Sequence, residues 1–186
     1  MGSFPQKGRP ERPLDPLDEA ATRVLNGDDS AFEAIVEATS PRLVRLAARI
    51  MGSLEEGEDV VQEAYLRAYR SLADRSFDRR ARVETWLRRI TTNAALDALR
   101  SRRRRPAASP EEPVGVDGAA AEARVALGEL GVWLRDLPPD QRVALTLKAV
   151  EGMSSGEVAG AMGVSEGAVE QLLVRARAAL RKKREG

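Results

Sequence analysis

The spacing of the apolar residues constrains this fold more than any other feature, since along most of the chain they recur every three or four positions. Ala, Leu, Arg and Glu dominate, and Val, Ile and Thr seldom alternate with polar residues over the length of a strand. This pattern is typical of amphipathic helices. Aromatic residues make up only 4% of the chain, so the core must be built from Leu, Val and Ala between closely packed helices. The sequence therefore predicts an all-α protein made of small helical bundles.

Two missing residue types exclude much chemistry. The chain has no Cys and no His, which excludes disulfides, the Cys- and His-based zinc sites, and nucleophiles activated by a histidine. Carboxylate catalysis and oxygen-ligated metals stay formally open, but Asp and Glu are scattered over the predicted helix faces without a matching constellation. We therefore expect no enzymatic activity, no catalytic residues, no metal and no cofactor.

The sequence also lacks the apolar segments that membranes require. No apolar run approaches the roughly 18–20 residues of a membrane span. Residues 1–15 are rich in Pro, Gly and charge and lack the apolar core of a signal peptide. We expect a flexible tail on a cytoplasmic, nucleoid-associated protein that does not insert into a membrane.

Charge is distributed unevenly, although the net charge is only +1. Seven Arg and a single acid lie between Arg88 and Arg105, and six basic residues without an acid lie between Gln171 and Arg184. The charged residues of 106–123 are all acidic. Two possible polyanion-binding sites therefore flank an acidic segment.

Capping and helix-breaking residues divide the first part of the chain, 16–105, into four predicted helices. The first runs from Pro16 to Asn26, and the second starts near Asp29 and contains Pro41, which should kink it or split it. Ser53-Leu-Glu-Glu56 has the pattern of a capping box that opens the third helix. The fourth helix runs from about Val83 to Arg104.

A second helical module is predicted over residues 119–186. The preceding segment, 106–118, has the composition of a flexible acidic linker, and its 13 residues could span roughly 40–45 Å when extended. The module's first helix should end near Asp136, and the next should carry Val143 to Val150 and close at Gly152.

The stretch from Ser154 to Arg177 has the pattern of a helix-turn-helix. Ser154-Ser-Gly-Glu157 is a second capping box, and Gly163-Val-Ser165 forms a tight turn: Gly163 takes the left-handed position, Val164 plugs the core and Ser165 caps the next helix. In a helix-turn-helix the second helix reads base edges in the major groove. An ordinary helical hairpin is the alternative, and the basic continuation of the second helix favours DNA binding.

Several motifs resemble the extracytoplasmic-function (ECF) sigma factors of the sigma-70 family. Leu137-Pro-Pro-Asp-Gln-Arg142, followed by the turn at 163–165 and Arg175-Ala-Arg177, resembles their C-terminal promoter-reading domain. Asp59-Val-Val-Gln-Glu63 is similar to their polymerase-clamp-binding helix. Thr85-Trp-Leu-Arg-Arg-Ile90, followed by Asn93, Asp97 and Arg100, is similar to their helix for the promoter element nearest the start site. The resemblance covers roughly Leu17 to Lys183.

This resemblance implies an alternative sigma factor, which binds core RNA polymerase at its clamp and flap regions and helps to melt promoter DNA. Residues 16–105 would be the region 2-like domain for the −10 element, and residues 119–186 the region 4-like domain for the −35 element. The acidic linker would thread the polymerase cleft. The protein would contact both duplex and melted strand, and an anti-sigma factor would be a further partner.

The resemblance also assigns roles to individual residues. Arg89, Arg100 and Arg104 would hold phosphates, while Asn93 would contact a base and Phe77, in the loop 73–82, would stack on a base flipped out of the duplex. The full candidate DNA-binding set is Phe77, Trp86, Arg89, Asn93, Asp97, Arg100, Arg104, Ser165, Glu166, Glu170, Gln171, Arg175 and Arg177. The candidate polymerase-binding residues are Asp59, Gln62 and Glu63.

Each assignment has a purely structural alternative. The stripe on the fourth helix could be a solvated face with an Asp97–Arg100 ion pair, Trp86 could be a core anchor, and the polar side of the third helix could simply face water. The recognition helix also departs from the family, because Ala168 and Glu170 stand where members often have Thr and a basic residue. A carboxylate at Glu170 could accept a hydrogen bond from a cytosine amino group.

Three other functions compete with the sigma-factor hypothesis. A helix-turn-helix regulator that acts without replacing the housekeeping sigma factor would need a sensing module, and the first half shows no such pattern. A DNA invertase or nuclease would need a nucleophile or carboxylate–metal cluster, and a pure interaction bundle leaves the run Arg102–Arg105 unexplained. Polymerase-dependent transcription from a promoter separates the sigma factor from these alternatives.

Overall fold

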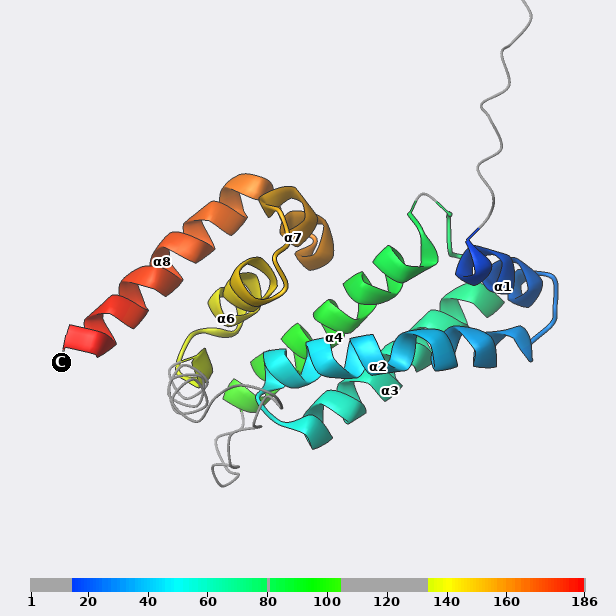
Figure 1. Cartoon of the computed structure of the whole chain (residues 1–186), viewed down its shortest axis with the longest axis horizontal. Helices are drawn as coiled ribbons and strands as arrows, with labels where there is room; N and C mark the ends of the chain where they lie inside the picture. The colour runs from blue at the N-terminus through cyan, green and yellow to red at the C-terminus, as the bar shows by residue number, and fades with distance from the viewer. Residues whose placement is uncertain (1–14, 80, 105–133, 186) are drawn as a thin grey trace, which may run out of the picture.

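A computed structural model of the chain describes residues 15–79, 81–104 and 134–185 (Figure 1). All secondary structure within these ranges is helical, without a strand. The prediction of an all-α protein is confirmed. The linker predicted at 106–118 and most of the helix expected up to Asp136 lie outside the described residues.

Four helices form the first module: α1 (Pro16–Leu25), α2 (Ala31–Met51), α3 (Leu54–Ala73) and α4 (Val83–Arg104). Helices α2 and α3 are antiparallel across a tight turn, α4 packs against both, and α1 lies across the far end of this bundle (Figure 1). The core consists mainly of aliphatic side chains, among which Ile35, Ile50, Leu72 and Leu87 are fully buried. This composition is the one expected from a chain with few aromatic residues.

The turn between α2 and α3 follows from two local signals. Gly52 adopts a left-handed conformation with φ 78° and ends α2. The Ser53 hydroxyl then accepts a hydrogen bond from the backbone N–H of Glu56 at 3.3 Å and opens α3. Only this half of the predicted capping box is seen, because the Glu56 carboxylate binds Arg102 of α4 at 2.6 Å instead.

Pro41 does not split the second helix, which continues from Ala31 to Met51. Its side chain is exposed. The carbonyl group that loses its partner to proline therefore lies on the solvent side of the helix, where water can satisfy it.

Helices α2 and α3 are in close contact at Gly57. A Cβ atom added there would lie 2.6 Å from the backbone nitrogen of Ala48. We expect Gly57→Ala to destabilise the protein by about 1–3 kcal/mol, because the backbone of α2 must move away. Thermal unfolding measures this effect. The matched control is Gly160→Ala in α7, where no atom lies within 4 Å of the added carbon; if both variants melt alike, the close crossing is not a constraint.

The second module contains α6 (Pro139–Leu145), the π-helical turn η1 (Thr146–Val150), α7 (Ser155–Met162) and α8 (Glu166–Glu185). Ser154 and Glu157 form the predicted capping box at the start of α7. Gly163 is left-handed with φ 68°, and the Ser165 hydroxyl accepts from the N–H of Ala168 at 3.2 Å. The predicted helix-turn-helix geometry is therefore present.

Val164 does not plug the core of this turn, contrary to the sequence-based expectation. It is 40% exposed. The neighbouring side chains Met162 and Val169 are buried and fill the space between α7 and α8 instead.

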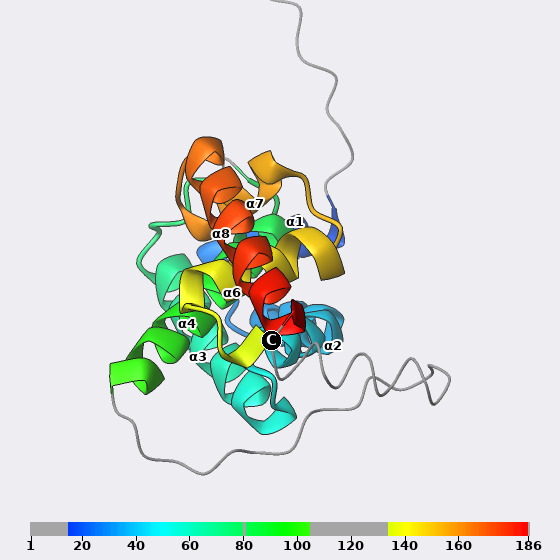
Figure 2. The ribbon, with the colours of Figure 1, turned by 90° about the vertical axis from the view of Figure 1, so that its left-hand side faces the viewer.

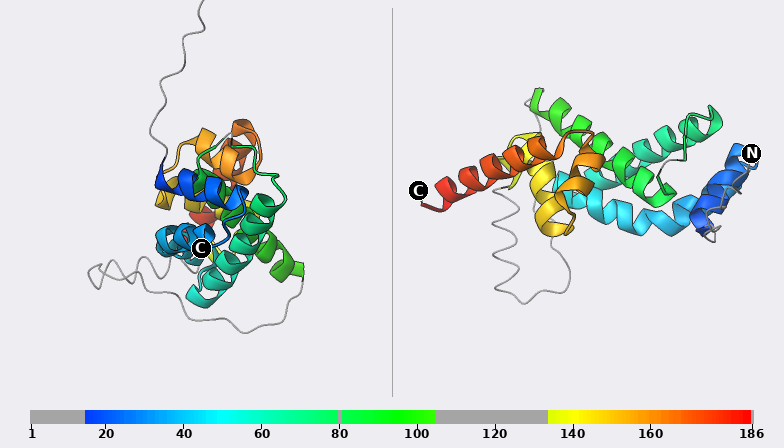
Figure 3. Two further views of the ribbon diagram at one scale, coloured as in Figure 1. Left: turned by 90° about the vertical axis from the view of Figure 1, so that its right-hand side faces the viewer. Right: turned by 90° about the horizontal axis from the view of Figure 1, so that it is seen from above.

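The second module packs along α4, mainly through α7 and α6 (Figures 1 and 2). Two ion pairs bridge the modules, Arg49–Glu151 and Arg100–Asp140, each at 2.5 Å. Seen from above, α8 extends away from the first module, and α1 lies at the opposite end of the molecule (Figure 3). The structure thus has a closed arrangement of the two modules.

A buried arginine lies at the centre of this contact. Arg142 of α6 is only 5% exposed, and a Cβ added to Gly52 would lie 2.8 Å from its Nη2 atom. Arg135 donates a hydrogen bond from Nη2 to the carbonyl of Gly52 at 3.1 Å. Cations of the second module thus contact the C-terminal end of α2, where the helix dipole favours positive charge. Burial lowers the pKa of Arg142 to about 10, with the nearby Arg135 charge contributing.

Candidate nucleic-acid interface

Helix α4 carries the first group of candidate DNA-binding residues. Arg89, Asp97, Arg100 and Arg104 are exposed, and Asn93 is half-buried. Their spacing places all five on one face of the helix. The face combines three cations with one carboxylate and one amide, so it offers positive charge for phosphates beside an amide that can both donate and accept hydrogen bonds.

The Asp97–Arg100 ion pair that belongs to the purely structural alternative is not formed. Asp97 accepts from Arg67 of α3 at 3.1 Å, and Arg100 binds Asp140 of α6 at 2.5 Å. Residues from other helices supply these partners, and spacing along one helix cannot predict them.

The second module stands directly beside this face of α4. A Cβ added to Gly163, in the turn of the helix-turn-helix, would lie 4.0 Å from the Nη2 atom of Arg89. At the other end of the contact, the carboxylate of Asp140 accepts a hydrogen bond from the guanidinium of Arg100. In the closed arrangement, part of the candidate face on α4 is therefore engaged by protein.

The loop before α4 is anchored through Phe77, which is 8% exposed. Its ring lies against Trp86, with 4.3 Å between the ring centroids and 35° between the planes. Trp86 itself is half-buried and packs on the core. Phe77 was expected to stack on an unpaired base, but its burial leaves it no free face in this structure. The exposed side chains near it include Ser76, Asp78 and Arg79.

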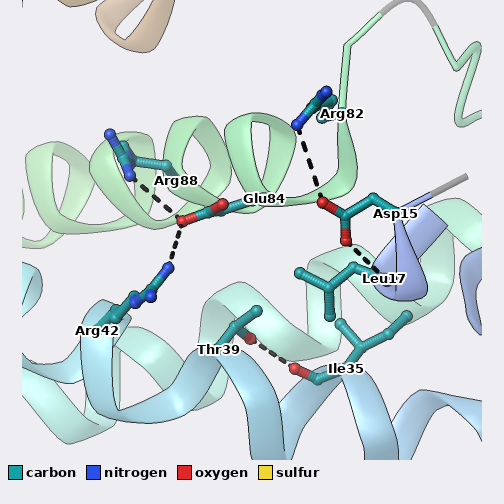
Figure 4. Close-up of polar contacts among 8 residues, drawn as sticks. All are labelled: Asp15, Leu17, Ile35, Thr39, Arg42, Arg82, Glu84 and Arg88. Atoms are coloured by element: carbon teal, nitrogen blue, oxygen red, sulfur yellow. Dashed lines mark hydrogen bonds and ion pairs between the residues drawn. The ribbon is translucent and has the colours of Figure 1, made fainter. Parts of the chain in front are cut away.

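Helix α1 fixes the start of α4 on the other side of this loop. The carboxylate of Asp18 accepts from the backbone N–H of Val83 at 2.9 Å, which caps the first turn of α4. Asp15 lies 3.9 Å from the guanidinium of Arg82 (Figure 4). The orientation of α4 is therefore set by contacts from a distant part of the sequence.

Helix α3 presents the candidate polymerase-binding residues Asp59, Gln62 and Glu63, all of which are exposed. Glu63 pairs with Arg67 at 2.8 Å. Leu66, one turn after Gln62, is 52% exposed and adds an apolar group to this surface. Leu66 is not among the residues predicted from the sequence. The one feature of the sequence that indicates its exposure is its position outside the apolar stripe of the helix.

Helix α8 presents the third group. Val169, Leu173 and Ala176 face the core. The candidate DNA-reading residues all have exposed side chains: Ser165, Glu166, Glu170, Gln171, Arg175 and Arg177. Between them stands Val174, which is 60% exposed. The surface is thus acidic and apolar in its first turns and basic beyond them.

A groove of about 260 Å³ is lined by residues of α1, α2 and α4 and by Glu151 of the second module. Arg42 and Arg88 approach the carboxylate of Glu84 there, at 3.1 and 3.6 Å (Figure 4). Leucine side chains form part of its lining. Much of its charge is paired internally, and none of the candidate DNA-binding residues lines it.

Among the described residues, no group of Asp and Glu is arranged to hold a metal ion. The helices that the structure describes include none that is long and apolar enough to cross a membrane. The fold and its surfaces define a class of protein. It has two helical modules, of which the first carries the basic helix α4 and the second carries a helix-turn-helix.

Comparisons with known proteins agree with this class. The family model of sigma-70 region 2 matches residues 35–105, and the model of sigma-70 region 4 matches residues 128–180. The chain is 34% identical over 154 residues to the ECF RNA polymerase sigma factor SigM of Mycobacterium tuberculosis, covering 83% of this chain and 77% of that protein. It is 30% identical over 174 residues to SigW of Bacillus subtilis, covering 86% and 92%.

The solved structure of CnrH in complex with the cytosolic domain of CnrY is also similar, with a TM-score of 0.62 and 27% identity over 92% of this chain and 98% of that chain. The chain belongs to the ECF sigma factors of the sigma-70 family. It is an alternative sigma factor that directs RNA polymerase to promoters, and members of this family are non-catalytic initiation factors.

Proposed function

We propose that the two modules divide promoter recognition between them. The first module, 16–105, binds the polymerase clamp through α3 and the −10 element through α4, where Asn93 contacts the melted strand. The second module, 119–186, reads the −35 duplex through α8. The protein has no catalytic activity of its own and acts in the cytoplasm, on the nucleoid.

The observation that carries this proposal is the separation of surfaces on one small bundle. The α3 residues Asp59 and Gln62 are exposed, as are the cations of α4, and the Arg67 side chain that binds Asp97 links the two helices. A bundle of this kind can dock on a protein through one helix while the other meets DNA. In the loop between α3 and α4, Phe77 is buried and the Arg79 guanidinium donates a hydrogen bond to the hydroxyl of Thr22 at 2.5 Å. We propose that exposed side chains of this loop hold a displaced base.

The closed arrangement must open for this function. The −10 and −35 elements are centred about 25 base pairs apart, or roughly 85 Å along the duplex at about 3.4 Å per step. Two modules joined by the ion pairs Arg49–Glu151 and Arg100–Asp140 cannot reach both elements. We propose that core polymerase binds the modules separately and thereby releases Arg100 for DNA.

An anti-sigma factor is the remaining proposed partner. The similar protein CnrH has been solved in complex with the cytosolic domain of CnrY. A partner that favours the closed arrangement would keep α4 engaged by the second module and so hold this sigma factor inactive.

Replacement of Asp59 and Gln62 by Ala tests the polymerase contact. We expect the double variant to bind core polymerase at least about tenfold more weakly. Interface side chains that cost more than about 1 kcal/mol each when truncated lie near the centre of a contact, and we place Asp59 and Gln62 there. Helicity by circular dichroism should not change, because both side chains are exposed. Glu37→Ala, at an exposed position of α2, is the matched control. If the double variant still co-purifies with core enzyme to the same extent, α3 is not the helix that docks on the polymerase.

A further inference from the structure

The first turns of α8 lack the residues that usually contact DNA. From Glu166 to Val174 the helix has no Lys and no Arg. Glu170 and Gln171 are exposed there instead. The N-terminal part of a recognition helix is the part that meets base edges. These side chains must therefore select bases without the usual contact of Arg or Lys with O6 and N7 of guanine.

The carboxylate of Glu170 is held in place by the preceding helix. The hydroxyl of Ser155, the first residue of α7, donates a hydrogen bond to Oε1 of Glu170 at 2.5 Å. Ser155 is half-buried, which limits the positions its hydroxyl can take. A carboxylate fixed in this way loses less rotamer entropy when it binds a base than one that moves freely in solvent.

Glu166 supports the same arrangement. Its Oε1 atom lies 3.0 Å from the position of a Cβ on Gly156, so its carboxylate covers the first turn of α7. Free backbone N–H groups and the positive end of the helix dipole favour negative charge at this turn. Glu166 and Glu170 are thus both accommodated against α7, and of these two only Glu170 stands a full turn into the reading helix.

A fixed carboxylate can only accept hydrogen bonds, and this limits the bases it can recognise. In the major groove, guanine and thymine present acceptors, and adenine presents its amino group beside the acceptor N7. Cytosine presents the N4 amino group without a neighbouring acceptor. We propose that Glu170 is a specificity-determining residue that selects a cytosine in the upstream promoter element, with Ser155 as its positioning residue. This inference rests on the proposed function, in which α8 reads duplex DNA.

The test uses holoenzyme reconstituted from core RNA polymerase and the full chain. Transcripts are sequenced from promoter templates with a randomised upstream element. We expect one position to be strongly enriched in cytosine, and N4-methylcytosine at that position to lower transcription roughly tenfold, because its one remaining amino hydrogen pairs with guanine and none is left to donate into the major groove.

Variants of the two residues should change this preference in different ways. Glu170→Gln should shift the enriched base from cytosine to adenine, because an amide can pair with both N6 and N7 of adenine. Ser155→Ala should keep cytosine as the preferred base but discriminate against the others several-fold less. Glu37→Gln makes the same chemical change on an exposed site of α2 and should give the same element as the natural chain.

Two negative results have different meanings. An upstream element without an enriched cytosine, or one that Glu170→Gln leaves unchanged, overturns the role of Glu170 while the promoter-reading role of α8 stands. Transcription that is indifferent to the whole upstream element overturns both that role and the proposed function of the second module.

Discussion

A sigma factor whose modules are covalently locked together should bind core polymerase through α3 yet fail to transcribe. The lock replaces the ion pair between Arg49 and Glu151, which joins α2 to the second module at 2.5 Å, by two cysteines bridged with a short bismaleimide. Since the natural chain has no Cys, the reagent reacts only at these positions. We expect promoter transcription to fall to background, because the locked modules cannot span the roughly 85 Å between the two promoter elements.

The matched control is a lock within the first module. Arg42 and Glu84 join α2 to α4 at 3.1 Å, and a bridge between cysteines at these positions does not cross the module boundary. This locked protein should transcribe as well as the same variant without the reagent. If the Arg49–Glu151 lock also transcribes normally, the closed arrangement does not have to open and the proposed division of the promoter is wrong.

The second large effect concerns the basic continuation of α8. Replacing Arg175 and Arg177 by Ala should weaken holoenzyme binding to promoter duplex and lower the slope of log affinity against log salt by roughly 1–2, since each lost phosphate contact removes about 0.9 released counterions. Both side chains are exposed, so we expect no loss of stability.

This variant should remain active on a template that is already melted around the start site, because the upstream duplex contact matters most for the initial binding. Binding titrations at several salt concentrations and transcription from both templates measure the two steps separately. An unchanged salt slope would mean that neither arginine contacts phosphate. Lys148→Ala, on the π-helical turn outside the candidate reading face, provides a control that removes a positive charge elsewhere in the second module.

Local signals allowed the sequence to predict the helices and their caps closely. Ser154 and Ser165 cap their helices, and Gly163 takes the left-handed conformation, because these preferences depend on a few adjacent residues. Pro41 was harder to interpret, since whether a proline breaks a helix depends on which side of the helix faces water. Val164 shows the same difficulty, because a turn residue's burial depends on the helices around it.

The contacts between distant segments were not predictable. Arg142 lies in a motif that supported the family resemblance, yet nothing in its neighbours along the chain indicates that its guanidinium is buried against the end of α2. The partners of Asp97 and Arg100 come from α3 and α6, and the pair Ser155–Glu170 joins two helices. Spacing along one helix predicts which side chains share a face and leaves open what that face meets.

Phe77 illustrates this limit at the candidate site. An aromatic residue in a charged loop before a basic helix is consistent with base stacking, and the family resemblance favoured that role. The structure instead packs its ring against Trp86. We propose that exposed side chains beside Phe77, such as Ser76 and Arg79, meet the displaced base, for which Arg79 must leave the hydroxyl of Thr22.

Transcription by a reconstituted enzyme tests the central proposal most directly. Core RNA polymerase is mixed with the full chain and a library of genomic or random templates, and the 5′ ends of the transcripts are mapped. The account predicts RNA that starts at discrete sites only when the chain is present, with two shared sequence elements upstream of each start. Transcripts whose start sites do not depend on the chain, or starts that need a housekeeping sigma factor as well, would contradict it.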